Sequence, residues 1–319
     1  MFFEFYESLV SEFPDGCDQL LGQPLAADNS LWLSVDGDTC PSLLFSVRRD
    51  APRSDIELRS ISIRFSRDCV IEDASGVGAS GIYTIVRLNE NDPDIIRMFL
   101  RVFEESFRVR GRYYTNKEIS IRILELADLF EKVEGSIGDV VGLWGELYIL
   151  SRSSNLAAAV HSWCCHKKAK YDYVADGFVL EAKTTVRSKR KHRFSLEQLR
   201  PAGGFSVYVA SLAVVEVNSG KSASEFMDEL CIKISDDELR ARFLAQCLVK
   251  GGRDIYRNSL KLSAFPDQTS LVMFSSLNIP VPEVGQALPI ENVRFDVDLT
   301  GIAPISSREM DEVLEFGKR

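Results

Sequence analysis

The segment YDYVADGFVLEAKTT, residues 171–185, decides how the middle of this chain folds. Asp176 and Gly177 strongly favour a β-hairpin, because the two-residue type I′ turn needs positive φ at both central positions. Apolar and aromatic residues flank the pair on both sides, as is typical of strands. The segment therefore predicts two antiparallel strands joined by a loop of two residues.

The register of this hairpin brings charged side chains together. A two-residue loop sets Asp172 opposite Glu181, and such cross-strand partners share a face with Cβ atoms about 4.5–5.5 Å apart. Lys183 points to the same face as Glu181, since side chains alternate along a strand. Two opposed carboxylates destabilise a hairpin, and charges in a core strand are costly unless they are paired. A divalent cation removes this conflict, because Mg²⁺ prefers hard oxygen ligands.

A third acidic residue stands in GLWGELYIL, residues 142–150, which is apolar almost all round and therefore predicts a buried helix. Glu146 shares a face of this helix with Gly142, Leu143 and Leu150. A lone acid on an apolar face requires a partner or a metal. Two interpretations stay open: a further carboxylate for the metal site, and a glutamate that is exposed at a helix end or paired with an arginine.

Positive charge is concentrated around the hairpin. The segment from His166 to Arg200 holds ten Lys or Arg residues and four Asp or Glu residues, which gives it a charge of +6. The rest of the chain carries a charge of −15, so the net charge of the whole chain is −9. A local basic segment on an acidic chain is typical of a surface that binds a polyanion. The alternative is a solvated charged loop.

The composition is that of an ordinary globular protein, with 319 residues, 45% hydrophobic and 27% charged. The seven cysteines include no CxxC pair, which favours reduced thiols in a cytoplasmic protein. No segment reaches the roughly 18 apolar residues of a membrane span. The first ten residues carry Glu4 and Glu7 and no basic residue, so we expect no signal peptide and no membrane association.

The pattern along the chain predicts two parts. Residues 1–92 contain alternating and β-branched segments separated by Gly, Pro, Asp and Ser, which predict a β-rich N-terminal module. Residues 93–319 contain several helices, the hairpin, a long apolar strand and a C-terminal return to alternation. We expect the chemistry in this second part, with its core at about 135–217.

Asp172, followed eight residues later by Glu181-Ala182-Lys183, resembles the D…(D/E)xK signature of the PD-(D/E)XK nuclease superfamily. The segments GLWGELYIL, YDYVADGFVLEAKTT and HRFSLEQL more specifically resemble the "PD-(D/E)XK motif proteins" of bacterial restriction-modification and defence operons. The resemblance covers about residues 135–200. The chain departs from the superfamily pattern in having no proline before Asp172.

The resemblance implies an α/β (α+β) fold with a restriction-endonuclease-like core, in which a mixed sheet is flanked by helices. It implies a metal-dependent DNA endonuclease of restriction or antiphage defence, with Mg²⁺ as cofactor and Mn²⁺ as its substitute. The expected metal ligands are Asp172, Glu181, the Ala182 carbonyl and Glu146. Lys183 would position the attacking water or stabilise developing charge. The alternative is a catalytically silent DNA-binding or structural subunit of a defence complex.

DNA is the partner that the resemblance implies, with other operon-encoded defence subunits and a second copy of the chain as further partners. Contacts would be made mostly to backbone phosphates, which confer salt dependence and little base selectivity. The expected DNA-contacting residues are Arg187, Lys189, Arg190, Lys191, His192, Arg193 and Gln198. Two of them have alternatives: Gln198 also completes a helix capping box with Ser195, and His192 could simply be exposed.

Overall fold

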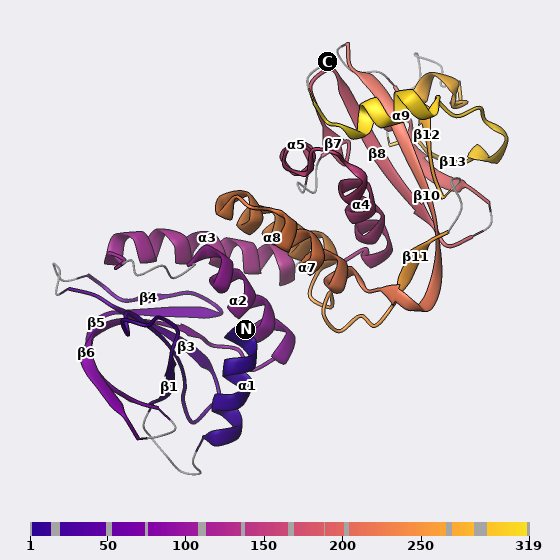
Figure 1. The fold of residues 1–319 in the computed structure, drawn as a ribbon. Coiled ribbons are helices and arrows are strands. Elements are labelled where there is room, and N and C mark those ends of the chain that lie inside the picture. Colours follow the sequence, from indigo (N-terminus) through magenta and orange to yellow (C-terminus); the bar gives the residue numbers. More distant parts are fainter. Residues whose placement is uncertain are drawn as a thin grey trace. The chain divides into compact units, whose positions relative to one another are not determined.

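The structure, a computed structural model, describes residues 2–13, 20–48, 53–73, 76–107, 113–134, 138–164, 169–187, 189–200, 204–265, 270–283 and 292–317. The chain forms two compact units, Met1–Ser136 (unit 1) and Ile137–Arg319 (unit 2) (Figure 1). Helices and strands, with both parallel and antiparallel pairings, make this an α+β fold, as expected. None of the helices in the described ranges combines the length and apolar character needed to cross a membrane.

Unit 1 is built around one six-stranded sheet of order β1-β2-β3-β6-β5-β4. Strand β1 also pairs with β5, so five of these strands close into a ring (Figure 1). Closure leaves few unpaired strand edges. The elements are α1 (Phe2–Glu12), β1 (Leu20–Pro24), β2 (Leu31–Val35), β3 (Pro41–Ser46), β4 (Ile56–Glu57), β5 (Ile61–Glu72), β6 (Gly78–Leu88), α2 (Pro93–Ser106) and α3 (Asn116–Glu134).

Helix α2 belongs to unit 1. Asp92 caps its first turn, and its apolar face carries aromatic residues at helical spacing. The ring of Phe107, at the end of α2, lies 5.0 Å from that of Phe45 on β3 and 5.0 Å from that of Phe103. These aromatic contacts join the helix to the β module. The two compact units divide at 136/137, so α2 and α3 belong to the unit that contains the strands of residues 1–92.

Unit 2 contains a mixed sheet of order β11-β10-β8-β7, with β12 also paired to β10, and a two-stranded sheet of β13 and β9. The two central strands, β8 and β10, are parallel and are connected through β9 and a short helix. The elements are α4 (Val140–Arg152), α5 (Leu156–Ser162), β7 (Tyr173–Val174), β8 (Phe178–Thr185), β9 (Lys191–Ser195), α6 (Leu196–Leu199), β10 (Ser206–Lys221), α7 (Ala223–Lys233), α8 (Asp237–Gly251), β11 (Leu262–Ala264), β12 (Leu271–Ser275), η1 (Ser276–Asn278), β13 (Arg294–Asp298), η2 (Leu299–Gly301) and α9 (Ser307–Leu314).

The predicted hairpin is formed by β7 and β8 in the predicted register. Tyr173 pairs with Leu180, and Val174 pairs with Val179. The turn type differs from the prediction. Gly177 has a φ of 84°, whereas Asp176 is not among the described residues with positive φ, so the turn is not type I′. Positive φ falls only on the glycine, which has no Cβ to clash.

Candidate active site

Helix α4 lies directly against strand β8, and this close approach brings Glu146 to the strand. A Cβ atom at Gly145 would lie only 1.8 Å from Oγ1 of Thr184, so only glycine fits between the helix and the strand. Asp139 caps the helix by accepting from the backbone N–H of Gly142. The neighbour of Gly145 in the chain, Glu146, is 8% exposed. The helix is therefore buried as predicted, and its one acid sits beside the strand that carries the signature.

Asp172 lies at the edge of β8, just before β7 begins. Its Oδ2 accepts a hydrogen bond of 2.9 Å from the backbone N–H of Ala182. The N–H and C=O groups of one strand residue point to the same edge, because opposed residues of an antiparallel pair exchange both bonds. The Ala182 carbonyl therefore faces the edge where the Asp172 carboxylate lies.

Glu181 is held by two donors. Its Oε1 accepts hydrogen bonds from Nζ of Lys183 at 2.7 Å and from Nε2 of Gln198 at 2.6 Å. The side chain is 5% exposed. Burial and then the negative charge of Asp172 raise the pKa of Glu181 to about 7, while the Lys183 ammonium acts in the opposite direction. The second oxygen, Oε2, has no donor among the residues that the structure describes.

Glu146 is held in a similar way by a different lysine. Its Oε2 accepts from Nζ of Lys250 at 2.5 Å and from the indole N–H of Trp163. Burial and then the charge of Asp172 raise the pKa of Glu146 to about 8, and the Lys250 ammonium lowers it. Glu146 is therefore neither exposed at a helix end nor paired with an arginine, since it is buried and its partner is the half-buried Lys250.

Lys250 is the site residue that the sequence did not reveal. It lies in the last turn of α8, and its Nζ is also 3.3 Å from Oδ1 of Asp172. Burial disfavours the ammonium, but Glu146 and Asp172 outweigh this and raise the pKa of Lys250 above its ordinary 10.5. A lysine before Gly251-Gly252 reads as the ordinary end of a helix. Only the packing of α8 against α4 and α5 places it at the carboxylates.

The three carboxylates do not form one tight cluster. Asp172 raises the pKa of both glutamates, so it lies near each of them. Alternation along β8 separates the two glutamates, because Thr184, which meets α4 next to Glu146, and Glu181 point to opposite faces of the strand. Within the described part of the chain, no three His, Cys, Asp or Glu residues are grouped so as to hold a metal ion. Asp172 is thus shared between a pair with Glu181 and a pair with Glu146.

The donor set nevertheless fits a hard divalent cation. Mg²⁺ is commonly bound through one or two protein carboxylates, with water and substrate phosphates as its other ligands, so three grouped acids are not required. Asp172, Glu181 and the carbonyl of Ala182 present oxygen atoms around the same short stretch of β8. One oxygen of Glu181 is not used by a described donor, which leaves it available to a cation.

Gln198 fulfils the structural role and also contacts the site. Ser195 and Gln198 form the capping box of α6, in which Gln198 Oε1 accepts from the Ser195 backbone N–H at 2.9 Å. The amide nitrogen of the same side chain donates to Glu181. The sequence offered DNA as the contact of Gln198 beside the capping box, and the structure places its amide on the Glu181 carboxylate. One side chain therefore fixes both the helix start and the orientation of a proposed metal ligand.

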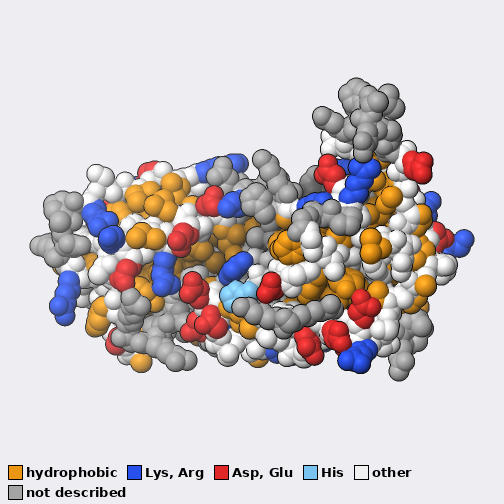
Figure 2. Space-filling view, turned by 90° about the horizontal axis from the view of Figure 1, so that it is seen from above, with side chains coloured by type: hydrophobic (Ala, Val, Ile, Leu, Met, Phe, Trp, Pro, Cys, Tyr) orange, Lys and Arg blue, Asp and Glu red, His pale blue; other side chains and the backbone are white. Residues whose placement is uncertain are grey.

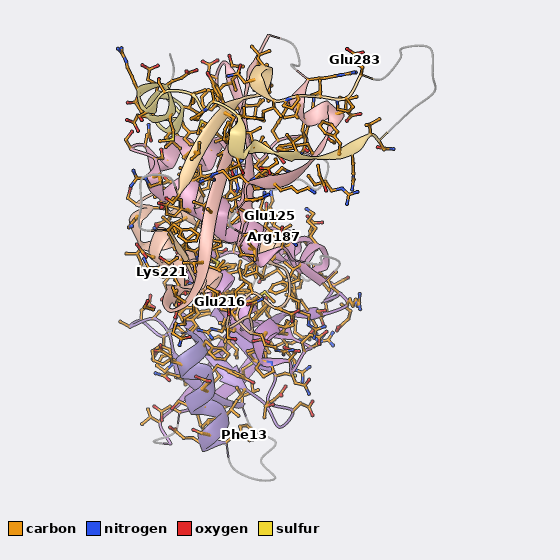
Figure 3. All side chains as sticks on the ribbon, turned by 90° about the vertical axis from the view of Figure 1, so that its right-hand side faces the viewer. Phe13, Glu125, Arg187, Glu216, Lys221 and Glu283 are labelled. Atoms are coloured by element: carbon orange, nitrogen blue, oxygen red, sulfur yellow. The ribbon has the colours of Figure 1, made fainter. Side chains whose placement is uncertain are left out.

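The basic segment divides into an exposed and a buried set. Arg187, Lys189, Lys191 and Arg193 are exposed (Arg187 is labelled in Figure 3). His192 is buried, and its Nε2 lies 2.7 Å from Oγ of Ser211. Burial, followed by the charges of Lys183 and Arg190, lowers the pKa of His192 to about 4, so the ring is neutral at pH 7. The expected phosphate contact of His192 is wrong in this arrangement.

Arg190 also acts within the protein. Its guanidinium donates to the carbonyl oxygen of Ser211 at 2.6 Å, to Oγ of Ser211 at 2.9 Å and to the carbonyl oxygen of Ser270 at 3.1 Å. These bonds tie the start of β9 to β10 and to the residue before β12. We therefore remove Arg190 from the set expected to contact DNA. His166, Lys167 and Lys168, which begin the basic segment in the sequence, lie outside the described residues.

Acidic residues from the end of the chain face the exposed set. In the sheet of β9 and β13, Asp296 pairs with Arg193 and Asp298 pairs with Lys191. The Nζ of Lys191 lies 3.8 Å from the carboxylate of Asp296. On the face that Figure 2 shows, blue Lys and Arg side chains are interspersed with red Asp and Glu side chains. The positive charge of the segment is thus partly compensated in three dimensions.

The negative charge of the chain is concentrated in unit 1. Residues 1–136 hold 24 Asp or Glu and 15 Lys or Arg, a charge of −9, whereas residues 137–319 hold 23 of each and are neutral. A net charge of −9 disfavours binding to a polyanion. This argument does not apply to unit 2, which carries the carboxylates and the basic segment.

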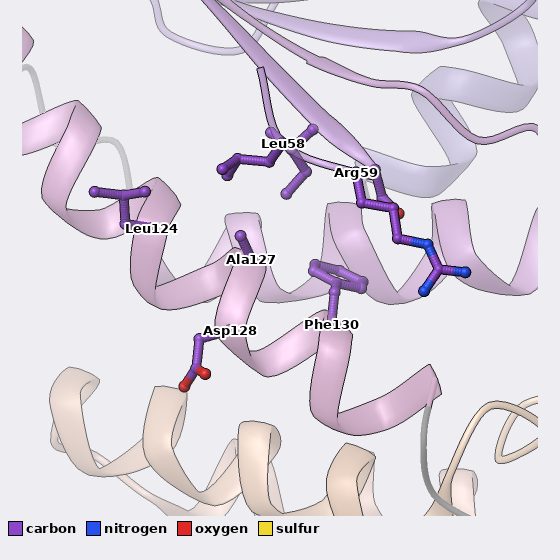
Figure 4. A pocket seen from close by; sticks show the side chains of 8 residues that line it. Leu58, Arg59, Leu124, Ala127, Asp128 and Phe130 are labelled. Carbon is purple, nitrogen blue, oxygen red and sulfur yellow. The ribbon is translucent and has the colours of Figure 1, made fainter. Parts of the chain in front are cut away.

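The described pocket of unit 1 has a different chemistry. A cavity of about 320 Å³ lies between the turn after β4 and helix α3 (Figure 4). Its lining is mostly apolar, with one basic and one acidic residue: Leu58, Arg59, Ser60, Ile61, Leu124, Ala127, Asp128 and Phe130. A single carboxylate among apolar side chains does not make a hydrolytic site. We therefore place the candidate active site in unit 2.

A mixed sheet whose hairpin carries two carboxylates and a lysine, with a glutamate on the preceding helix, defines a PD-(D/E)XK nuclease-like protein. Residues 26–300 match the family described as "Putative PD-(D/E)XK family member, (DUF4420)". The match covers most of the chain, so the chain belongs to this family, and the expected superfamily is confirmed. No curated protein and no solved structure matches the chain.

Proposed function

We propose that unit 2 is a metal-dependent DNA endonuclease that hydrolyses phosphodiester bonds, in restriction or antiphage defence. The observation that carries the proposal is the arrangement around β8. There the charge of Asp172 acts on two buried glutamates, Lys183 pairs with Glu181, and Lys250 pairs with Glu146 and Asp172. Buried charges are retained at such density when they have a chemical use, since their desolvation is costly. The family to which the chain belongs supports the same class of reaction.

In this proposal Asp172, Glu181 and the Ala182 carbonyl hold Mg²⁺, or Mn²⁺ in its place. Glu146, whose carboxylate interacts with that of Asp172, completes the acidic site. A divalent cation held there lowers the pKa of bound water and stabilises negative charge on the phosphate. Gln198 and Lys183 fix the Glu181 carboxylate from one side. The Lys183 ammonium, one step along the strand, orients the attacking water or donates to the phosphate oxygen on which charge builds.

Incubation of supercoiled plasmid with the full chain and Mg²⁺ is expected to give nicked or linear DNA, and excess chelator is expected to abolish cleavage. Asp172→Asn keeps the size of the side chain and an oxygen that can accept from the Ala182 N–H, but it removes the charge that a cation requires. We expect it to bind DNA and leave plasmid intact. Cleavage by this variant at the wild-type rate would remove Asp172 from the mechanism.

The exposed set of basic residues is expected to bind DNA phosphates. Simultaneous replacement of Arg187, Lys189, Lys191 and Arg193 by alanine leaves up to four phosphates without a cationic partner and alters no proposed metal ligand. Counterion release then predicts a salt dependence of log K that is shallower by roughly 0.9 for each such phosphate, up to about three to four units. Because Asp296 and Asp298 face two of these side chains, we expect the result below that upper limit.

A matched control changes four basic residues that pair with surface acids elsewhere in unit 2, namely Lys221, Lys233, Lys261 and Arg308. Both variants lose four positive charges, so a general charge effect would change both salt slopes equally. Measurement of DNA affinity over a range of salt separates the two. Equal slopes in both variants would contradict a specific role for the exposed set.

The second candidate function is a DNA-binding or structural subunit that does not cleave. It is favoured by the pairing of Lys250 with Glu146 and Asp172, which satisfies two of the carboxylates without a metal. This function predicts DNA binding that chelator does not change, and no cleavage with Mg²⁺ or Mn²⁺. The plasmid assay therefore separates it from the nuclease.

A further inference from the structure

Lys250 connects Glu146 and Asp172, two expected metal ligands, although it lies outside the D…(D/E)xK signature. Its Nζ is 2.5 Å from Oε2 of Glu146 and 3.3 Å from Oδ1 of Asp172. It also lies 5.5 Å from the centre of the Trp163 ring, so an aromatic face covers the ammonium. The ammonium thus occupies a place between two acidic oxygens, where a cation is electrostatically favoured.

The two lysines of the site are arranged differently. Lys183 contacts only Glu181 among the three carboxylates, and its ammonium lies over the ring of Phe194. Lys250 contacts the other two, including Asp172, which is the carboxylate shared by both pairs. A divalent cation that uses both oxygens of Asp172 has to replace the Lys250 contact. No such conflict exists with Lys183, since Glu181 has a second oxygen without a described donor.

We propose that Lys250 is a displaceable internal counter-ion, a positioning residue that competes with the divalent cation for Asp172 and Glu146. The inference rests on the proposed metal-dependent function. Without a metal, the ammonium balances the buried carboxylate of Glu146 and the half-buried carboxylate of Asp172, which would otherwise repel each other at a considerable cost. The long and flexible stem of a lysine allows the ammonium to withdraw when a cation arrives. The Lys250 ammonium therefore stabilises the folded site in the absence of metal, and it lowers the affinity of the site for a divalent cation.

Isothermal titration of the full chain with Mg²⁺ at pH 8.5, without DNA, tests this competition. Lys250→Met removes the charge and keeps an unbranched side chain against Trp163. Because a nearby positive charge opposes the binding of a second cation, we expect the variant to bind Mg²⁺ about tenfold or more tightly than wild type. Lys250→Arg keeps the charge and is expected to bind within about threefold of wild type.

Lys250→Gln serves as a second variant if the methionine variant does not fold, since its amide can still donate to Glu146 while carrying no charge. Circular dichroism establishes that each variant is folded. Lys261→Met, at a surface ion pair with Glu225, is the control for loss of a lysine elsewhere. We expect it to bind Mg²⁺ as wild type does.

The outcomes separate the inference from the function on which it rests. If wild type binds Mg²⁺ and the uncharged variants bind it equally or more weakly, Lys250 is an ordinary structural partner of Glu146 and the competition is refuted. If neither wild type nor the uncharged variants bind Mg²⁺ or Mn²⁺, the proposed metal-dependent function fails and the inference fails with it. Tighter binding in the uncharged variants alone supports both.

Discussion

Replacement of Lys183 by alanine is expected to lower the rate of DNA cleavage at saturating DNA by a factor on the order of a hundred or more, with DNA affinity near wild type. The reason is its position. Lys183 points to the same face of β8 as Glu181 and lies 2.7 Å from it, whereas the exposed basic residues lie beyond β8 and on β9. Loss of an interaction made mainly in the transition state lowers the rate and leaves ground-state binding unchanged. Single-turnover cleavage and a DNA-binding titration measure the two quantities separately.

Two variants define what the lysine supplies. Lys183→Arg keeps a positive charge but replaces the compact ammonium with a planar guanidinium, so we expect most of the loss to remain. Lys261→Ala removes a lysine from the surface of the same unit and is expected to cleave as wild type does. A Lys183→Ala enzyme that keeps its cleavage rate would show that the ammonium only neutralises Glu181.

The metal-free protein is expected to lose stability as the pH rises from about 4.5 to about 8. Glutamate has an ordinary pKa of 4.5, whereas burial and Asp172 raise the pKa of Glu146 to about 8 and that of Glu181 to about 7. Between these values the folded chain holds protons that the unfolded chain has released, so unfolding releases protons and the free energy of unfolding falls with rising pH. Each unit of pKa difference corresponds to about 1.4 kcal/mol.

Glu146→Gln removes one of these two groups while keeping an oxygen that can accept from Trp163 and Lys250. In chelator, we expect the variant to be more stable than wild type by a few kcal/mol at pH 8.5, and the difference to disappear below about pH 4.5, where Glu146 is protonated in both the folded and the unfolded chain. Urea unfolding at a series of pH values measures this. Glu216→Gln, at an exposed position of β10 (Figure 3), is the control and should follow wild type at every pH. Parallel pH profiles for all three proteins would contradict the raised pKa values.

Local rules of the sequence accounted for the hairpin and the buried helix. A two-residue loop fixes register over the few residues on each side of it, and Tyr173 and Leu180 pair as that rule requires. The apolar residues on nearly all sides of α4 predicted a buried helix, and Glu146 within it is 8% exposed. The capping box at Ser195 also formed as its spacing indicated. The turn type was not determined in the same way, because the pair Asp176-Gly177 is compatible with more than one two-residue turn.

The burial of His192, which was expected to contact a phosphate or to be exposed, had a signal in the sequence. In KHRFS, the segment of β9, exposed Lys191 and Arg193 alternate with buried His192 and Phe194. The period of two that placed Lys183 beside Glu181 also turns His192 towards the core. The density of charge in this segment hid the alternation, because a basic run suggests an exposed loop. Strand periodicity was the stronger rule.

The sequence by itself determined the signature, its register and the glutamate on the preceding helix, because turns, caps and strand alternation act between residues that are close along the chain. Only the tertiary structure decided which charges meet. Lys250 reaches Glu146 and Asp172 through the packing of α8, and Asp296 reaches Arg193 through the pairing of β13 with β9. Coulomb interactions depend on distance in space, so partners from remote segments leave no local pattern by which they can be found.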